Sequence, residues 1–247
     1  MGDNITMKEF AQLLIEAKEI FGVNIEQSEM QMLEDFADQM FESNQKYNLS
    51  GIKEPDDIRR KLFLDSISCV PVIKNLKKDK VIDIGTGAGF PGMIIKILNL
   101  DMHISLVDSV GKKIIFLEQV TENLGLKNVT AINDRAEILG QDHQHRERYD
   151  LVLARALAKM PAMLEYLLPL TTFGGYVIAQ RGSDTKQEIQ DSNLIIERLG
   201  GEIEEVIPVE IPGMTERYIL KIKKVNPTPK KFPRRVGVPK KKPLQNI

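Results

Sequence analysis

A short hydrophobic strand that runs directly into a glycine-rich turn sets the strongest constraint on the fold. The segment KVIDI at residues 80–84 is followed by GTGAGFPG at residues 85–92 and then by the helical run MIIKILNL. In doubly wound α/β proteins, a glycine-rich turn at the carboxyl end of the first strand binds a nucleotide. The order strand, glycine turn, helix therefore predicts an α/β fold with a ligand site at this turn.

Short β-rich runs alternate with helical stretches from residue 77 onward. The first five runs lie at residues 80–85, 103–108, 128–133, 149–154 and 175–180. Such alternation predicts a parallel sheet with right-handed crossovers.

Two further β-rich runs, at residues 203–211 and 217–223, follow a helix expected over residues 186–199. Only the short loop 212–216 joins these two runs. A loop of this length permits an antiparallel pair but no crossover, so the predicted sheet has seven strands and is mostly parallel.

The residues before 77 carry a different pattern. Apolar residues recur at helical spacing over 10–21 and 33–41 and again from Pro55 onward, which predicts an N-terminal helical segment. We therefore expect three parts: a helical segment over 1–76, an α/β domain over 77–225 and a tail over 226–247.

The tail differs from the rest of the chain in charge. The whole chain has 34 basic and 35 acidic residues, but residues 226–247 hold seven basic and no acidic ones, so the preceding part carries 27 basic against 35 acidic residues. Five prolines in the tail favour an extended segment that excludes helix. A basic tail on an acidic body suits a polyanion, with a solubilising disordered tail as the alternative.

The numbers of cysteines and histidines limit which disulfides and metal sites the chain can form. The single cysteine, Cys69, excludes an intramolecular disulfide, and the three histidines show no zinc spacing, so no metal site is expected. No apolar run has the length that crosses a bilayer, and the start lacks the features of a secretory signal. We therefore expect a cytoplasmic protein that does not associate with membranes, and we expect a monomer.

Details of the glycine turn indicate which nucleotide it accepts. A dinucleotide fingerprint requires glycine where Phe90 stands, and the turn lacks the G-K-[ST] ending of a triphosphate site. Gly87 and Gly89 would let ligand atoms approach the backbone, while Asp108, at the end of the second strand, would accept hydrogen bonds from a ribose diol. A nucleoside without a phosphate chain fits best, and S-adenosylmethionine is such a ligand. Asp83 would face its cationic part.

Several segments together resemble one family. They are similar to the glucose-inhibited division protein B family, the 16S ribosomal RNA guanine-N7 methyltransferases. The segments that carry this resemblance are KVIDIGTGAGFPGMIIKI, LVDSVGKKIIFLEQV, NDRAE, YDLVLARAL, KYNLSGIKEPDDI and the tail TPKKFPRRVGVPKKKPL. The resemblance covers residues 36–244 in order. It implies a class I S-adenosylmethionine-dependent methyltransferase fold, S-adenosylmethionine as the methyl donor, and 16S ribosomal RNA or the small ribosomal subunit as the partner.

The resemblance also implies roles for individual residues. Gly85 and Phe90, together with Gly87 and Asp108, should contact the donor. Ala136 and Glu137 in the NDRAE segment should frame the adenine. Arg155 should face the donor or the acceptor and is a candidate catalytic residue. Lys112 and Arg217 are the other catalytic candidates, and they should position the phosphate or base of the RNA. This chain has Leu62 where the family commonly has histidine, and Ser43 where it often has tryptophan.

The expected reaction requires few catalytic groups. Guanine N7 carries a lone pair and no proton, so its attack on a sulfonium methyl needs no general base, and no His/Asp or Cys/His pair occurs among the motifs. Cytosine C5 methylation needs a cysteine nucleophile, but Cys69 has the apolar neighbours of a packing residue. Alternatives are a methyltransferase for another RNA, a small molecule or a protein, and a non-catalytic RNA-binding module. Phe90 disfavours NAD-dependent oxidoreduction.

Overall fold

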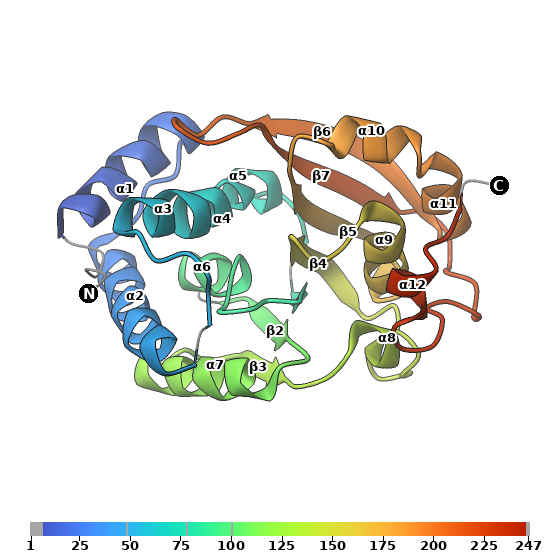
Figure 1. Ribbon diagram of the computed structural model, residues 1–247, viewed down its shortest axis with the longest axis horizontal. Coiled ribbons are helices and arrows are strands. Elements are labelled where there is room, and N and C mark those ends of the chain that lie inside the picture. Colours follow the sequence, from blue (N-terminus) through green and yellow to red (C-terminus); the bar gives the residue numbers. More distant parts are fainter. Residues whose placement is uncertain (1–6, 48, 78, 100, 246–247) are drawn as a thin grey trace. The chain divides into compact units, whose positions relative to one another are not determined.

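The computed structural model describes residues 7–47, 49–77, 79–99 and 101–245. Its seven-stranded sheet has the order β3-β2-β1-β4-β5-β7-β6. Figure 1 shows β4, β5, β7 and β6 side by side. The strands are β1 (Lys80–Ile84), β2 (His103–Val107), β3 (Val129–Ile132), β4 (Tyr149–Arg155), β5 (Thr171–Arg181), β6 (Gly201–Val209) and β7 (Arg217–Lys224). The pairs β2–β3, β1–β4 and β4–β5 are parallel, whereas β5–β7 and β6–β7 are antiparallel. The predicted mostly parallel sheet is confirmed.

The chain divides into two compact units. The first comprises residues 1–76, 86–133 and 210–214, and the second comprises residues 77–85, 134–209 and 215–247. None of the described helices is long and apolar enough to cross a membrane.

The first unit packs helices and strands β2 and β3 around an aromatic core. Its helices are α1 (Met7–Phe21), α2 (Gln27–Tyr47), α3 (Pro55–Ile58), the π-helical turn η1 (Arg59–Leu64), α4 (Asp65–Ile67), α5 (Cys69–Ile73), α6 (Gly92–Ile97) and α7 (Gly111–Asn123). Phe36 is central to the core, because its ring centroid lies 5.9 Å from that of Phe63, 5.3 Å from Phe90 and 6.4 Å from Phe116. These separations are typical of packed aromatic rings. Cys69 is fully buried, as the sequence predicts.

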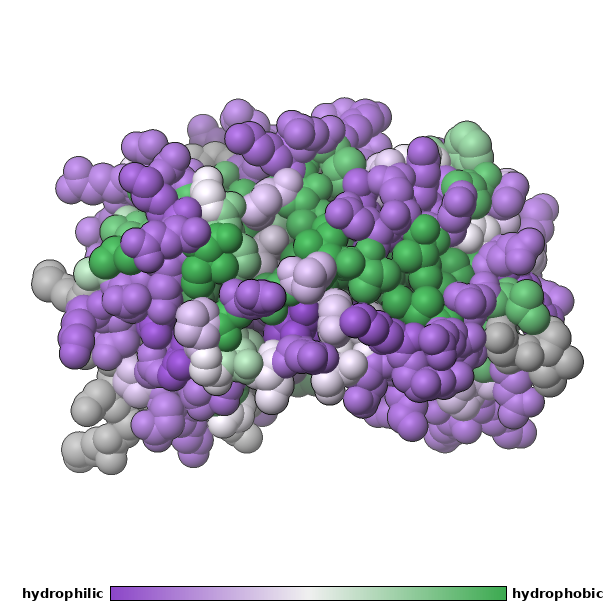
Figure 2. Space-filling model, turned by 90° about the horizontal axis from the view of Figure 1, so that it is seen from above, coloured by the Kyte–Doolittle hydropathy of each residue, from purple (hydrophilic) through white to green (hydrophobic). Residues whose placement is uncertain are grey.

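The second unit contains the remaining five strands and the helices α8 (Ala136–Leu139), α9 (Met160–Leu167), α10 (Thr185–Gln190), α11 (Asn193–Arg198) and α12 (Val238–Lys241). Strand β4 has parallel neighbours on both sides, and its residues 149–154 are all buried. Such a continuous apolar run is typical of a central parallel strand. At the sheet edge, β6 leaves apolar side chains partly exposed, and Figure 2 shows hydrophobic residues gathered over it.

Two local predictions in the second unit are wrong. The single helix predicted over 186–199 is two helices, α10 and α11, which are separated at Asp191 and Ser192. Short polar residues there favour helix ends and turns over a helix interior. The proline-rich tail also forms a helical turn, α12, with proline in its first turn. Proline is tolerated there because that N–H has no partner within the helix.

Candidate functional site

The predicted site residues belong to both units. Gly87, Phe90, Asp108 and Lys112 lie in the first, while Gly85, Ala136, Glu137, Arg155 and Arg217 lie in the second. Each set has its own local geometry.

Asp108 follows strand β2 and is 8% exposed. Its Oδ2 accepts a hydrogen bond from the Gly87 backbone N–H at 3.1 Å, and its Oδ1 accepts one from Val110 N–H at 2.9 Å. Lys113 Nζ lies 3.5 Å from Oδ2. A carboxylate has about four acceptor positions, so capacity for a diol remains. The structure thus brings together Gly87 and Asp108, which the sequence analysis assigned to one ligand.

The glycines of the turn serve different purposes. Gly87 has a φ of +63°, a backbone conformation that side-chain-bearing residues rarely adopt. Gly89 was expected to admit a ligand, but a Cβ there would lie 2.8 Å from Met93 Cγ and 3.0 Å from Leu117 Cδ2. The missing side chain of Gly89 therefore allows the turn to pack against protein atoms.

Phe90 is 2% exposed, and its ring packs against Phe36 and Phe63. Its side chain thus belongs to the aromatic core of the first unit. A donor contact from Phe90 would be made by its backbone.

Residues around Asp108 add charge and rigidity. The Asn133 side chain donates to the Asp108 carbonyl oxygen at 2.9 Å, which fixes the backbone that carries the carboxylate. Lys112 is exposed in the first turn of α7. The RNA-positioning role of Lys112 stays a prediction, whereas its neighbour Lys113, which the sequence analysis did not identify, approaches the Asp108 carboxylate. The sequence offered one signal for the pair of Asp108 and Lys113: a lysine in the first turn of the helix that follows the acidic residue.

In the second unit, residues around β1 and after β4 lie close together. Gly85 has a φ of +71°, a backbone conformation that favours glycine. A Cβ there would lie 2.5 Å from Leu157 Cδ1, so the turn after β1 lies against the segment after β4. Asp83 is fully buried in β1, where it pairs in register with Leu153.

The segment after β4 is held by a pair that the sequence analysis did not identify. Arg155, half-buried, ends β4 opposite Gln180. Arg181 Nη1 donates to the Ala158 carbonyl at 2.7 Å, and its Nη2 pairs with Glu188. These contacts fix the course of the chain that follows Arg155.

The remaining predicted residues lie on α8 and at the start of β7. Ala136 and Glu137 are 8% and 7% exposed, and Glu137 Oε1 accepts a hydrogen bond from Gly237 N–H of the tail at 2.8 Å. Arg217 is half-buried, and its Nε makes no hydrogen bond to the described part of the chain.

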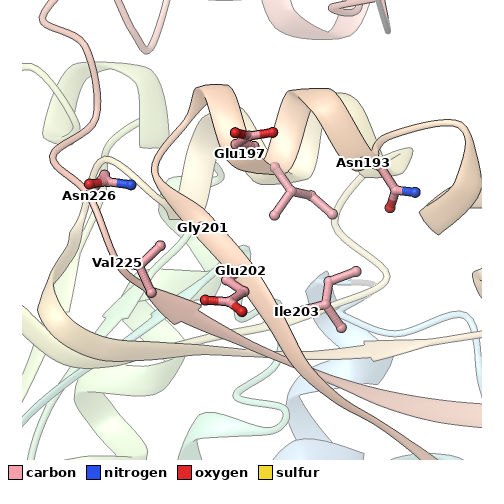
Figure 3. Close-up of a pocket in the computed structure, with 8 residues that line it drawn as sticks. Asn193, Glu197, Gly201, Glu202, Ile203, Val225 and Asn226 are labelled. Atoms are coloured by element: carbon pink, nitrogen blue, oxygen red, sulfur yellow. The ribbon is translucent and has the colours of Figure 1, made fainter.

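A separate groove of about 400 Å³ lies between α11 and β6 (Figure 3). Glu197 and Glu202 contribute carboxylates, and none of the described residues that line the groove is basic. Its location at the antiparallel edge of the sheet and its acidic lining make it unsuitable for a polyanion.

Comparison with solved structures identifies the class of fold. The structure is similar to a SAM-dependent methyltransferase from Aquifex aeolicus, with a TM-score of 0.54 and 19% sequence identity over 72% of this chain and 97% of that one. The chain thus has the α/β fold of S-adenosylmethionine-dependent methyltransferases.

Sequence comparisons identify the family. The sequence model of GidB, described as rRNA small subunit methyltransferase G, matches residues 29–211. The ribosomal RNA small subunit methyltransferase G of Desulforamulus reducens is 43% identical over 83% of this chain and 86% of the relative. That of Acetivibrio thermocellus is 42% identical over 94% of this chain and 96% of the relative. The chain belongs to the GidB family of rRNA small subunit methyltransferases G.

Proposed function

We propose that this protein transfers a methyl group from S-adenosylmethionine to N7 of a guanine in 16S ribosomal RNA. The observation that carries the proposal is the Asp108 carboxylate, held by Gly87 and Val110 N–H groups in a chain of the GidB family. This carboxylate fits a ribose diol because two backbone N–H groups fix its orientation while acceptor positions remain.

The donor would be held by residues on several elements. Asp108 and Gly87 would bind its ribose, Gly85 and Phe90 would contact the donor through their backbone, and Ala136 and Glu137 would frame the adenine. When bound, S-adenosylmethionine supplies a methyl group on a positively charged sulfur. The carboxylate of Asp83, a buried residue of β1, would face this charge.

The protein's part in the transfer is positioning. Guanine N7 has a lone pair and no proton, so no side chain has to remove one. Arg155, Lys112 and Arg217 would bind the RNA so that N7 approaches the methyl carbon in line, and Arg181 would fix the segment after Arg155. Holding two reactants in this way contributes up to about 7–11 kcal/mol to lowering a barrier.

The tail would supply further RNA contacts. Exposed cations remain on it at Lys230, Lys231, Arg235, Lys240, Lys241 and Lys242, whereas Arg234 is paired with the buried Glu165. Replacing Lys240, Lys241 and Lys242 by glutamine should weaken RNA binding and reduce the slope of log K against log salt by about 0.7 for each phosphate that the tail no longer neutralises. An unchanged slope would show that these three lysines do not contact RNA phosphates.

The proposed reaction is tested with purified protein, methyl-labelled S-adenosylmethionine and small ribosomal subunits or their RNA. We expect label on one guanine, at N7, as shown by cleavage at the modified base. Absence of label in every assembly state of the subunit, despite donor binding, would contradict the proposed substrate. Absence of donor binding by calorimetry would instead favour a non-catalytic RNA-binding module.

We further propose that the protein works in the cytoplasm as a monomer and needs no metal ion. We also propose that it consists of a helical segment (1–76), a methyltransferase domain (77–225) and a basic tail (226–247). The single cysteine and the scattered histidines support the absence of a metal site. Light scattering of the purified protein and activity in the presence of a chelator test the monomer and the metal independence.

A further inference from the structure

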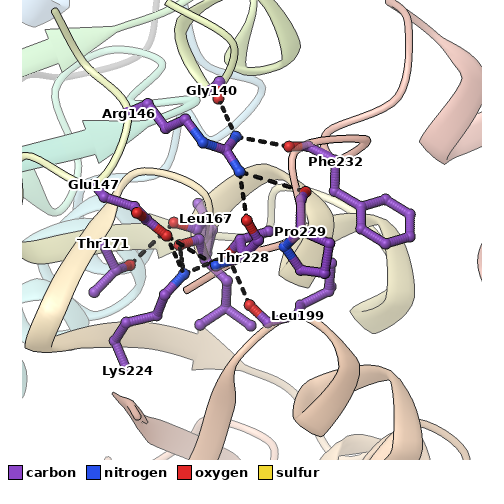
Figure 4. Close-up of polar contacts among 11 residues, drawn as sticks. Gly140, Arg146, Glu147, Leu167, Thr171, Leu199, Lys224, Thr228, Pro229 and Phe232 are labelled. Atoms are coloured by element: carbon purple, nitrogen blue, oxygen red, sulfur yellow. Dashed lines mark hydrogen bonds and ion pairs between the residues drawn. The ribbon is translucent and has the colours of Figure 1, made fainter. Parts of the chain in front are cut away.

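The C-terminal tail is bound to the second unit by specific contacts of its backbone. Arg146, in the loop before β4, donates from Nη1 to the carbonyl oxygens of Gly140 and Phe232 and from Nη2 to that of Thr228, each at 2.7 Å (Figure 4). One guanidinium thus joins the residue that follows α8 to two points of the tail. The Phe232 side chain is 2% exposed.

A second group of tail contacts involves α8 itself. Gly237 N–H donates to Glu137 Oε1 at 2.8 Å, and Gln141 Nε2 donates to the Pro233 carbonyl at 2.7 Å. A Cβ on Gly140 would lie only 2.7 Å from Pro233 Cγ, so the tail packs directly against the end of α8. Residues 228–237, here called the strap, therefore contact α8 at its first turn and at its end.

The strap is anchored on its other side by a buried carboxylate. Glu165 of α9 is 0% exposed. It accepts hydrogen bonds from the Arg234 backbone N–H at 2.7 Å and from Arg234 Nη2 at 2.7 Å. Because this anchor lies between Pro233 and Gly237, it fixes the part of the strap that meets α8.

We infer that the strap positions Ala136 and Glu137 for the donor, so that the tail contributes to S-adenosylmethionine binding in the absence of RNA. The inference rests on the proposed function, in which these two residues frame the adenine. Ala136 and Glu137 begin a helix of only four residues, which has little stability of its own. Because the helix is so short, the contacts with the strap fix the positions of these two residues.

The test is donor binding by titration calorimetry on the full-length protein without RNA. Gly140→Ala places a methyl group against Pro233 and should displace the strap from α8. We expect the Kd for S-adenosylmethionine to rise about tenfold with one site per chain, as for the loss of one net hydrogen bond. Gly182→Ala is the matched control, because a Cβ at Gly182 meets nothing within 4 Å.

A truncation after Arg234 gives an independent variant. It removes the Gly237 N–H but keeps the Arg146 and Glu165 anchors, and it should also raise the Kd. In turnover assays, the KM for the donor should rise in Gly140→Ala while kcat at saturating donor stays close to that of the wild type. The truncation is compared by donor binding without RNA alone, because it also removes the exposed lysines of the tail. A purely structural role predicts fewer binding sites per chain with an unchanged Kd.

An unchanged Kd in whichever of these variants folds would overturn the inference, whatever the number of sites. Failure of the wild-type protein to bind S-adenosylmethionine would instead refute the proposed function. The two failures are therefore distinguishable.

Discussion

The contact between Arg234 and Glu165 joins the tail to α9 and allows a quantitative prediction. Glu165 is 0% exposed, and the Arg234 side chain is 27% exposed. Arg234 Nε donates to both carboxylate oxygens, at 2.9 and 3.1 Å, and Nη2 donates to Oε2 at 2.7 Å. In Arg234→Ala these three hydrogen bonds disappear. Among the donors in the described part of the chain, the backbone N–H of residue 234 then remains as the partner of the carboxylate.

The expected cost follows from the burial of the carboxylate. Removal of one partner from a buried ion pair typically costs about 3–5 kcal/mol, because the remaining charge no longer has a counter-charge. The partly exposed arginine leaves a path for water, and the backbone hydrogen bond remains. We therefore expect Arg234→Ala to lower the free energy of unfolding by about 3 kcal/mol, a large share of the roughly 5–15 kcal/mol available to a domain.

Equilibrium unfolding in urea, followed by circular dichroism because the chain has no tryptophan, measures this change in free energy. Arg235→Ala is the matched control, since Arg235 is the next residue and its side chain is exposed. It should leave the unfolding curve almost unchanged. The double variant Glu165→Leu/Arg234→Met, which removes both charges, should recover much of the stability. A decrease below about 1 kcal/mol in Arg234→Ala would refute the reasoning, because it would mean that Glu165 needs no counter-charge.

Two further predictions concern single side chains. Asp108→Ala should weaken S-adenosylmethionine binding by about tenfold or more in calorimetry, because it removes the oxygens proposed to accept from the ribose; an unchanged Kd would contradict that role. Burial lowers the pKa of Lys224 to about 8, with the Glu147 carboxylate opposing this shift. Between about pH 8 and 10.5, Lys224 binds more protons in the unfolded chain than in the folded one. The contribution of Lys224 to the free energy of unfolding therefore rises with pH across this range, and it is lost as the pH falls through 8. The difference in unfolding free energy between wild type and Lys224→Met should therefore shift in favour of the wild type from pH 7.5 to 9.5, and the opposite trend would contradict the assignment.

Apolar patterns and loop lengths were sufficient to predict the strands and their parallel or antiparallel sense. Buried parallel strands need apolar runs, and loop length decides between a crossover and a hairpin, so β1, β4 and β5 and the antiparallel pair β6–β7 follow from local patterns. The break between α10 and α11 was missed because the apolar spacing continues across it. Short polar residues at the break offer the backbone a competing conformation that periodicity does not detect.

The site could be predicted only in part. Gly87 and Asp108 lie in a strand–turn–strand pattern with a general physical meaning, and they do form a hydrogen bond. Arg146 and Glu165 had no such signal, because their tail partners lie 86 and 69 residues away in sequence. No spacing rule connects charges that only the tertiary fold brings together.

The basic tail illustrates how tertiary contacts divide one run of charge into two roles. From the sequence, all its cations are equivalent candidates for RNA phosphates. In the structure, Arg234 neutralises Glu165 inside the protein, whereas Lys240, Lys241 and Lys242 are exposed. Exposed charges are screened by salt far more than a buried pair. Salt should therefore weaken the RNA contacts of the tail while the Arg234 anchor persists, so donor binding should remain nearly constant over the range of ionic strength in which RNA affinity falls.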